Sequence, residues 1–225
     1  GRVVAGLLGF EAERLHGADD FQPARLTVDM YRLPDRSAIT VTTKAVREGG
    51  RIRVIEAEAF SRGTSIARAS VQFLRRSANA PGEYQTIPHW DAPAPQDLPE
   101  PEDSHRIWER RPIAGGMGAA GPRRMWMREV RELVGGHALT PFVRVAVAAD
   151  FASPLSNSGD QGLGYINGDV TVYLHRLPRK DWIGFEAVHH NATDGVAVGE
   201  CWLYDEEGPI GTSTVAAISQ RRVEA

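Results

Sequence analysis

The sequence of 225 residues predicts an α+β protein made of two tandem copies of one unit, in which an antiparallel sheet wraps a long helix. The first observation is a shared motif, apolar-Thr-Val-x-apolar-x-Arg-Leu-Pro, which begins at Leu26 and again 144 positions later at Val170. The second is that this offset pairs similar residues over about 35 positions, which chance would rarely produce. The pairs are Ile39 with Ile183, Val54 with Val198, Glu56 with Glu200 and Phe60 with Tyr204, and a one-residue slip then pairs Gly63 with Gly208.

The strands of the unit are predicted from alternation with a period of two. In residues 25–33, Leu26, Val28 and Met30 alternate with more polar neighbours, as in a strand with one buried face. Three further β-rich segments follow, and glycine-containing turns separate them at 48–50 and 61–63. These segments are 38–47, 51–60 and 64–75, and the second copy has matching turns at 192–195 and 205–208. We therefore expect each copy to end in a meander of four antiparallel strands.

A helix is predicted before each meander. In the second copy, Thr140 is a good N-cap, Pro141 suits the first helical position, and apolar residues recur at helical spacing up to Ala149. In the first copy, the apolar segment 3–15 ends before a glycine. Both segments are apolar on most sides, which favours helices wrapped by a sheet. Residues 124–133 alternate as a strand before the second helix, and we expect a native N-terminal segment, absent from this sequence, to supply its counterpart.

The chain is predicted to divide into a first repeat at 1–76, a linker at 77–123 and a second repeat at 124–225. The linker holds eight of the 14 prolines and shows no sustained periodicity, which favours extended or irregular structure. It also contains Trp90 and Trp108. A purely disordered tether would seldom carry two tryptophans, so we expect parts of the linker to pack along the repeats.

Bulk properties exclude several classes of partner and site. A net charge of −3 gives no electrostatic reason to bind nucleic acid, and no apolar run approaches the roughly 20 residues of a membrane span. The single Cys201 excludes an internal disulfide and a cysteine-rich zinc site, and it fits a reducing, cytoplasmic setting. We expect no cofactor and no metal. Gly116 to Gly121 matches a nucleotide-binding glycine pattern but lacks the flanking strand and helix, so we interpret it as a flexible loop. The adjacent His189 and His190 would point to opposite faces of a strand, which makes them poor joint ligands for a metal.

The most specific residues lie at the end of the second helix and on the strands that follow. Ala149-Asp150-Phe151 ends the helix, Asn167-Gly-Asp169 begins a strand that continues to Arg176, and a later strand begins at Gly208. Together with the duplicated unit, these segments resemble the type II, TesB-like acyl-CoA thioesterases of lipid metabolism, whose fold is the double hotdog. The resemblance covers nearly the whole chain apart from the linker.

In that family, an Asp on the second-copy helix works with a Thr-, Ser- or Asn-type residue of the next strand and with a Gln near the last strand. The Asp matches Asp150 and the strand residue matches Asn167, so the resemblance implies that these two are the catalytic residues. The Gln position falls at Val215 or Ala216, and neither side chain can orient a water. The sequence departs from the family pattern at that point.

Thioester hydrolysis needs a base, a water and a donor for the developing oxyanion. Asp150 follows an apolar helix, where burial would disfavour the charged carboxylate, and the Asn167 amide can hold the water or donate to the oxyanion. Asp169 and Arg176 are the expected substrate-binding residues, with Arg176 at the CoA phosphates. Each residue also has a structural interpretation. Asp150 would cap the helix, and Asn167 would form a turn with the following glycine. Asp169 would be an acceptor at a strand start, and Arg176 would be structural because it repeats as Arg32.

Three functions are consistent with these residues. The first is an acyl-CoA thioesterase that releases free acid and CoA by Asp150-activated water, with the acyl chain between the two copies. The second is a non-catalytic acyl-thioester-binding protein, which the missing Gln favours. The third, a hydratase or dehydratase of the same fold, ranks last because no His follows Asp150 at short spacing. The expected partner is acyl-CoA, and a homodimer or higher homo-oligomer is left open.

Overall fold

A computed structural model describes residues 1–35, 37–100, 107–116 and 121–220. Within these residues, the chain forms an eleven-stranded antiparallel sheet and three α-helices, namely α1 (Arg2–His16), α2 (Pro141–Ala149) and α3 (Ala152–Ser156). The spatial order of the sheet is β2 (Ile39–Glu48), β3 (Ile52–Ser61), β4 (Thr64–Arg75), β1 (Phe21–Met30), β10 (Asp169–Leu174), β13 (Gly208–Ser219), β12 (Val196–Asp205), β11 (Ile183–Thr193), β6 (Arg124–Glu129) and β5 (Trp108–Ala114). β9 (Tyr165–Asn167) also pairs with β13, β7 (Ser158–Gly159) pairs with β8 (Gly162–Leu163), and a short 3-10 turn spans Pro95–Asp97.

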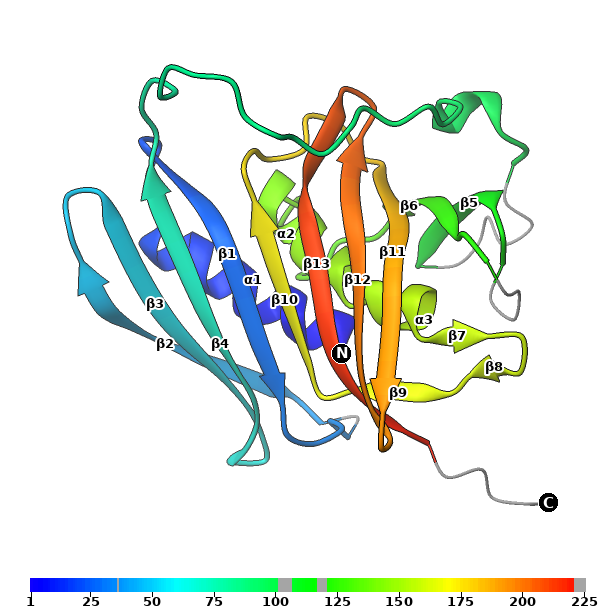
Figure 1. Ribbon diagram of the computed structural model, residues 1–225. Helices are drawn as coiled ribbons and strands as arrows, with labels where there is room; N and C mark the ends of the chain where they lie inside the picture. Colours follow the sequence, from blue (N-terminus) through cyan, green and yellow to red (C-terminus); the bar gives the residue numbers. More distant parts are fainter. Residues whose placement is uncertain (36, 101–106, 117–120, 221–225) are drawn as a thin grey trace.

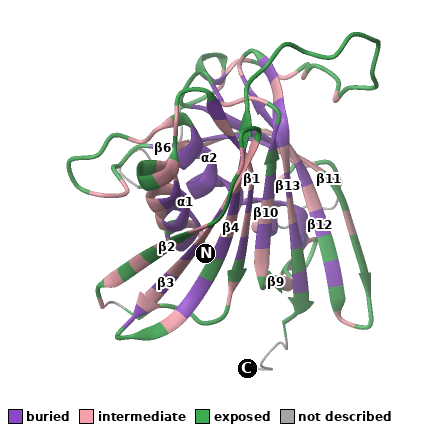
Figure 2. Ribbon diagram, turned by 90° about the vertical axis from the view of Figure 1, so that its left-hand side faces the viewer, coloured by how far each residue is buried: buried purple, intermediate pink, exposed green. Residues whose placement is uncertain are grey.

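The helices α1 and α2 pack against each other on one face of the sheet (Figure 1), and α2 is buried almost throughout (Figure 2). The N-cap predicted for α2 is confirmed, because the Thr140 hydroxyl accepts a hydrogen bond from Val143 N at 3.1 Å. Leu8 of α1, Phe142 of α2 and Ile55 of β3 are among the fully buried side chains between helices and sheet. Burial of each such side chain contributes about 1.5–3 kcal/mol, which explains why both helices are apolar on most sides.

The central pair of strands is β1 and β10, which run antiparallel with Thr27 opposite Thr171 (Figure 1). β4 pairs with the other edge of β1, and β13 pairs with the other edge of β10. From the central pair outward, the sheet therefore reads β1-β4-β3-β2 on one side and β10-β13-β12-β11 on the other. Each side thus contains the four strands expected of one copy, and β6 and β5 extend the second group. The predicted four-stranded meander is wrong, because the first strand of each group, β1 or β10, pairs with the last, β4 or β13, and not with the next strand along the chain.

Three further predicted details differ from the structure. β1 begins at Phe21, before residue 25, because residues 21–23 already pair with β4. They do not pair with β10, and a proline is tolerated where one edge of a strand is unpaired. β6 ends at Glu129, before residue 133. The one-residue slip that pairs Gly63 with Gly208 is wrong, because Gly63 lies in a turn whereas Gly208 is already the first residue of β13.

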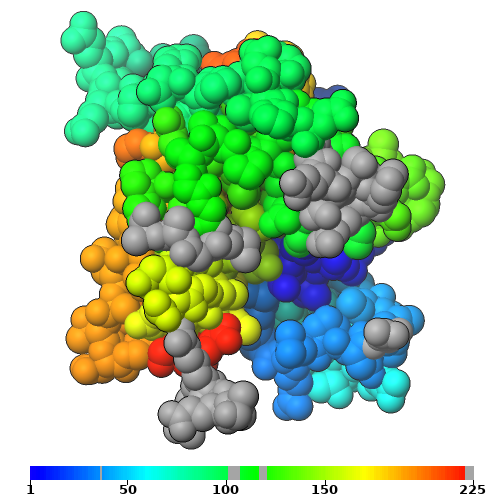
Figure 3. All heavy atoms as spheres, turned by 90° about the vertical axis from the view of Figure 1, so that its right-hand side faces the viewer, coloured from blue at the N-terminus to red at the C-terminus, as the bar shows by residue number. Residues whose placement is uncertain are grey.

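The segment 77–123, predicted to be a linker of extended or irregular structure, contains the regular strand β5, which pairs with β6 at the end of the sheet. Pro112 is tolerated there because β5 is an edge strand. Farther upstream, the Trp90 ring stacks on Tyr204 at 4.6 Å and meets Trp126 edge to face. Atoms of this segment, coloured green, cover the upper part of the molecule in Figure 3. The segment thus packs on the sheet, as its two tryptophans suggested.

No helix in the described part of the chain is long and apolar enough to cross a membrane, and the longest, α1, has 15 residues.

Candidate active site

Three elements converge on the carboxylate of Asp150. Asp150 directly follows α2, and its side chain is 19% exposed. Its Oδ1 accepts a hydrogen bond from Asn167 Nδ2 of β9 at 3.0 Å. Its Oδ2 lies 3.4 Å from the backbone nitrogen of Gly1, where α1 begins. The carboxylate therefore sits among polar groups at the junction of two helices and a strand, directly after the buried helix α2.

Asn167 is held by two hydrogen bonds from its amide nitrogen. Besides Asp150, the Nδ2 group donates to the Asp169 carbonyl oxygen at 2.9 Å. An Asn amide has two N–H donors, so both are used, and the side-chain carbonyl oxygen keeps its acceptor capacity. The structure thus brings Asp150 and Asn167 together, as the sequence predicted for a joint site.

The carboxylate of Asp169 contacts the backbone of the neighbouring strand. Its Oδ1 accepts a hydrogen bond from Ala216 N of β13 at 2.6 Å. Burial, with a further contribution from the Asp29 charge opposite it on β1, raises the pKa of Asp169 above its ordinary value. The geometry matches the structural interpretation of Asp169, that of an acceptor at the start of a strand.

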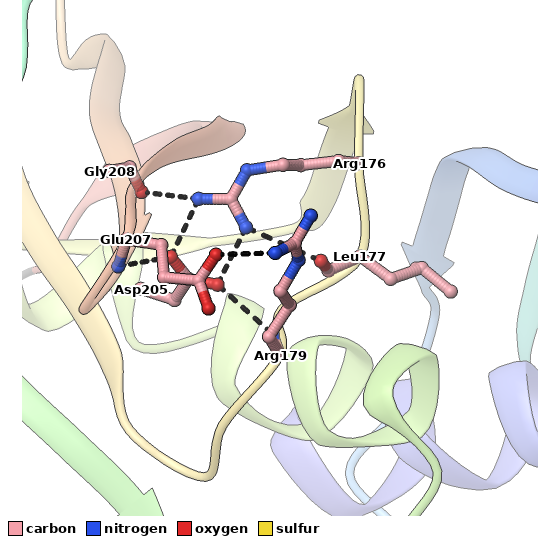
Figure 4. A network of polar contacts seen from close by, with 6 residues as sticks. All are labelled: Arg176, Leu177, Arg179, Asp205, Glu207 and Gly208. Atoms are coloured by element: carbon pink, nitrogen blue, oxygen red, sulfur yellow. Dashed lines mark hydrogen bonds and ion pairs between the residues drawn. The ribbon is translucent and has the colours of Figure 1, made fainter.

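Arg176 lies at the other end of β10, seven residues beyond Asp169, which corresponds to roughly 20 Å along a strand. Its guanidinium binds both carboxylate oxygens of Asp205 at 2.6 Å and donates to the Gly208 carbonyl oxygen at 2.9 Å (Figure 4). The structure therefore does not bring Arg176 to Asp150. It gives Arg176 the role of partner to a carboxylate whose side chain is 1% exposed.

Asp205 also accepts hydrogen bonds from the backbone N–H groups of Arg179 and Glu207, at 3.0 and 2.8 Å. Burial opposes its ionisation, but the hydrogen bonds from Arg176 and these two backbone groups outweigh it and hold the pKa of Asp205 below its ordinary value. This network joins the end of β12 to the loop after β10 (Figure 4).

Two cavities flank Asp150. The first has a volume of about 290 Å³, contains Asn167 and Gly168 in its wall, and is lined mainly by apolar side chains such as Val4 and Met30. The second has a volume of about 220 Å³ and is lined by Asp150 itself, buried apolar residues and one wall from β5, with Phe151, Met127, Val147 and Trp108 among its residues. A substrate whose reacting carbon lies at Asp150 could extend into both.

Two lining residues of the second cavity were missed in the sequence. Arg2 pairs with the buried carboxylate of Glu129 and lies 4.3 Å from the Trp108 ring centroid. Burial lowers the pKa of Arg2, although the charges of Glu129 and Asp150 oppose this. Trp108 also meets Phe151 edge to face at 6.1 Å. The one available signal was a tryptophan in a proline-rich segment; nothing in the sequence marked Arg2.

The family position of Gln remains without a water-orienting side chain. Val215 is fully buried, and Ala216 contributes only its backbone N–H, to Asp169. The nearby Ser213, also buried, donates its hydroxyl to the Ala149 carbonyl oxygen at 3.0 Å. Ser213 therefore fixes the end of α2 immediately before Asp150, a positioning contact that the sequence did not reveal.

In the residues that the structure describes, no cluster of His, Cys, Asp or Glu could hold a metal ion, and no histidine hydrogen-bonds to Asp150. His190 instead bonds to Asn157 Oδ1 at 2.9 Å. The glycine pattern at Gly116 to Gly121 falls partly outside the described residues, so its interpretation as a loop stays a prediction.

Two family models match almost the whole chain. The acyl-CoA thioesterase N-terminal domain matches residues 1–74, and the acyl-CoA thioesterase C-terminal domain matches residues 81–218. The division between them falls near the predicted start of the linker. A comparison with curated protein sequences finds no match.

Solved structures share the fold at low sequence identity. The tesB protein of Mycobacterium avium subsp. paratuberculosis is 18% identical with a TM-score of 0.73, over 98% of this chain and 87% of the other. An acyl-CoA thioesterase II of Mycobacterium marinum is 18% identical with a TM-score of 0.71, over 99% and 91%. A hot dog protein of unknown function from Alicyclobacillus acidocaldarius is 17% identical with a TM-score of 0.75, over 99% and 88%. These likenesses show a hotdog fold.

Proposed function

Because this chain belongs to the acyl-CoA thioesterase family, we propose that it hydrolyses acyl-CoA to a free acid and CoA with a water activated by Asp150. The observation that carries the proposal is the position of the Asp150 carboxylate, which is held by Asn167 between two largely apolar cavities. A carboxylate in this setting can accept a proton, while the cavities can hold the two arms of a thioester. Acyl-CoA is thus the proposed partner.

The proposed reaction is a water addition followed by loss of the thiolate. Asp150 accepts a proton from water as the water oxygen bonds to the thioester carbonyl carbon. Backbone N–H groups of the first turn of α1, beside Asp150, are the proposed oxyanion donors. The C–S bond then breaks, and the proton passes from Asp150 to the departing CoA sulfur. Because both Asn167 N–H groups are used, its proposed role is to hold Asp150 and to accept from the water.

We also infer that the fold is a double hotdog that arose by tandem duplication. β3 and β12 span Ile52–Ser61 and Val196–Asp205, and β4 and β13 span Thr64–Arg75 and Gly208–Ser219, each pair at the 144-residue offset. The register of β1 shifts around Ala24, and the strand is interrupted between β9 and β10 at Gly168, which is the residue that the offset pairs with Ala24. The boundaries 1–76, 77–123 and 124–225 fit this inference, although β5, from within 77–123, extends the half of the sheet that the second copy forms.

The second candidate is an acyl-thioester-binding protein without catalysis. The observation in its favour is the apolar pair Val215 and Ala216 at the position where the family has a water-orienting Gln. A cytoplasmic role in lipid metabolism is proposed for either function, since the lone Cys201 is buried and suits a reducing compartment.

The decisive experiment is free-thiol release from acyl-CoAs of increasing chain length by the wild type and the Asp150→Asn and Asp150→Ala variants. We expect turnover by the wild type and a loss of at least about 100-fold in both variants, the scale for a general base. Asp20→Asn is the matched control, because this exposed carboxylate forms only a surface ion pair with Arg75. Acyl-CoA binding without release by the wild type would support the non-catalytic candidate instead.

A further inference from the structure

Arg32 and Arg176 occupy the same place in the repeated motif, and their backbones are held alike. Before Arg32, the Tyr31 N–H donates to the Ile66 carbonyl oxygen at 2.9 Å. Before Arg176, the His175 N–H donates to the Ile210 carbonyl oxygen at 3.1 Å. Donors and acceptors are both 144 residues apart, and the Arg32 N–H makes a further bond to the same Ile66 oxygen at 3.2 Å. The larger difference between the two arginines lies in their side-chain surroundings.

Those surroundings differ in charge. The carboxylate that binds Arg176 comes from Asp205, the last residue of β12, and the equivalent last residue of β3 is Ser61. The Ser61 hydroxyl donates instead to Asp35 Oδ1 at 3.0 Å, and the other oxygen of Asp35 pairs with Arg62 at 2.9 Å. Within the described residues, the Arg32 guanidinium has no hydrogen bond or ion pair.

Arg32 also lies at a different end of the sheet from Arg176. β1 and β10 are antiparallel, so the segments after them leave from opposite ends (Figure 1). The segment after β1 lines the first cavity, which reaches Asn167 and Gly168. Tyr31 and Leu33, on either side of Arg32, are 52% and 89% exposed. Both line the first cavity and form an apolar rim at its open end.

From this arrangement we infer that Arg32 is the residue that binds the nucleotide phosphates of CoA, in place of its repeat partner Arg176. The inference rests on the proposed function. With the thioester at Asp150, the pantetheine arm would follow the apolar wall of the first cavity, and the phosphates would emerge at its exposed mouth. A guanidinium that no described residue pairs with can bind phosphate oxygens there with charge-assisted hydrogen bonds. The acyl chain then takes the second cavity, beside Trp108.

The test compares kcat/KM for an acyl-CoA and for the matching S-acyl-pantetheine, which carries the same thioester without phosphates. In Arg32→Ala we expect kcat/KM for the acyl-CoA to fall about tenfold, through KM, at low ionic strength. The value of kcat/KM for acyl-pantetheine should change less than about twofold, because that substrate lacks the phosphates that Arg32 would bind. Arg51→Ala is the control, since Arg51 is an exposed hairpin residue outside both cavities.

An equal fall for both substrates in Arg32→Ala, or no fall for acyl-CoA, would overturn the inference while leaving the thioesterase activity established. Calorimetric binding of CoA itself provides a readout that does not need turnover. If the wild type hydrolyses no thioester, the proposed catalysis fails on its own. In that case a CoA affinity lowered about tenfold by Arg32→Ala still supports the phosphate site, and an unchanged affinity refutes it.

Discussion

The side-chain hydroxyls of Thr27 and Thr171 lie 3.2 Å apart across the ladder that joins β1 to β10. The two residues hold the same place in the repeated motif, so the two copies of the motif pair with each other at this position. The neighbouring pairs, Leu26 with Val172 and Val28 with Val170, are equivalent to each other under the same offset and are all buried. A local twofold axis through the threonine pair would relate the two halves of the sheet.

The threonine pair should show a measurable coupling in a double-mutant cycle. Thr27→Val and Thr171→Val should each lower the free energy of unfolding, because each removes one partner of a half-buried hydrogen bond. The double variant should lose about 0.2–1 kcal/mol less than the sum of the single losses, as is usual for cross-strand pairs. Urea denaturation of the four proteins measures this coupling, and strictly additive losses would contradict it. Thr42→Val, on an exposed part of β2, is the control.

Much of the fold could be predicted because the same pattern of strands and turns occurs twice in the sequence. Period-2 alternation and turn glycines located β2, β3 and β4 to within a residue or so, and their counterparts followed from the offset. β5 escaped notice because Pro112 argues against a strand unless its edge position is known. The Gly63–Gly208 pairing failed because two hairpins of equal length place their glycines at different positions.

The candidate site was predictable only in part. Asp150 and Asn167 are 17 residues apart, and the helix end and the turn at Asn167-Gly168 could be located from local signals. The expectation that Asn167 begins a strand is wrong, because it is the last residue of β9 and the next strand, β10, begins at Asp169. Arg176 illustrates the opposite case. Its partner Asp205 lies 29 residues away. No local pattern distinguishes an arginine that binds a carboxylate from Arg32, which has no such partner among the described residues. Such differences depend on tertiary contacts. The strands of the two copies look equivalent in sequence, so these contacts cannot be predicted from the repeat.

Removal of Arg176 should strongly destabilise the fold. Arg176→Ala leaves the Asp205 carboxylate, with a side chain 1% exposed, without its charged partner, and loss of one partner of a buried pair costs about 3–5 kcal/mol. Arg176 is itself 25% exposed, so we expect the lower end of this range. Lys180→Ala, which breaks the more exposed pair with Glu206, should cost less than about 1 kcal/mol. Urea denaturation at pH 7 compares the variants, and equal losses would contradict the prediction.

The same network predicts a pH dependence of stability. The folded-state pKa of Asp205 is lowered, so its contribution is fully present above the unfolded-state pKa, near 4, and is lost as pH falls through the lower folded value. In Arg176→Ala, burial dominates and the sign reverses, so the variant should gain stability relative to the wild type as the pH falls from 7 toward 4. Unfolding free energies at pH 4, 5.5 and 7 test this. A constant difference between the two proteins would exclude Asp205 as the titrating group.

Trp108 should set the acyl chain length, if the acyl chain occupies the second cavity. The indole forms one wall of this cavity of about 220 Å³, between Arg2 and Phe151. Trp108→Ala would open the wall and allow additional methylene groups to be buried, each contributing about 0.8 kcal/mol. Two more buried methylenes correspond to a rise of about tenfold in the ratio of kcat/KM for a longer over a shorter acyl-CoA. Thiol release across a chain-length series measures this ratio. Trp90→Phe, in the separate aromatic cluster with Tyr204, should leave the profile unchanged; a shift in that variant alone would place the acyl chain elsewhere.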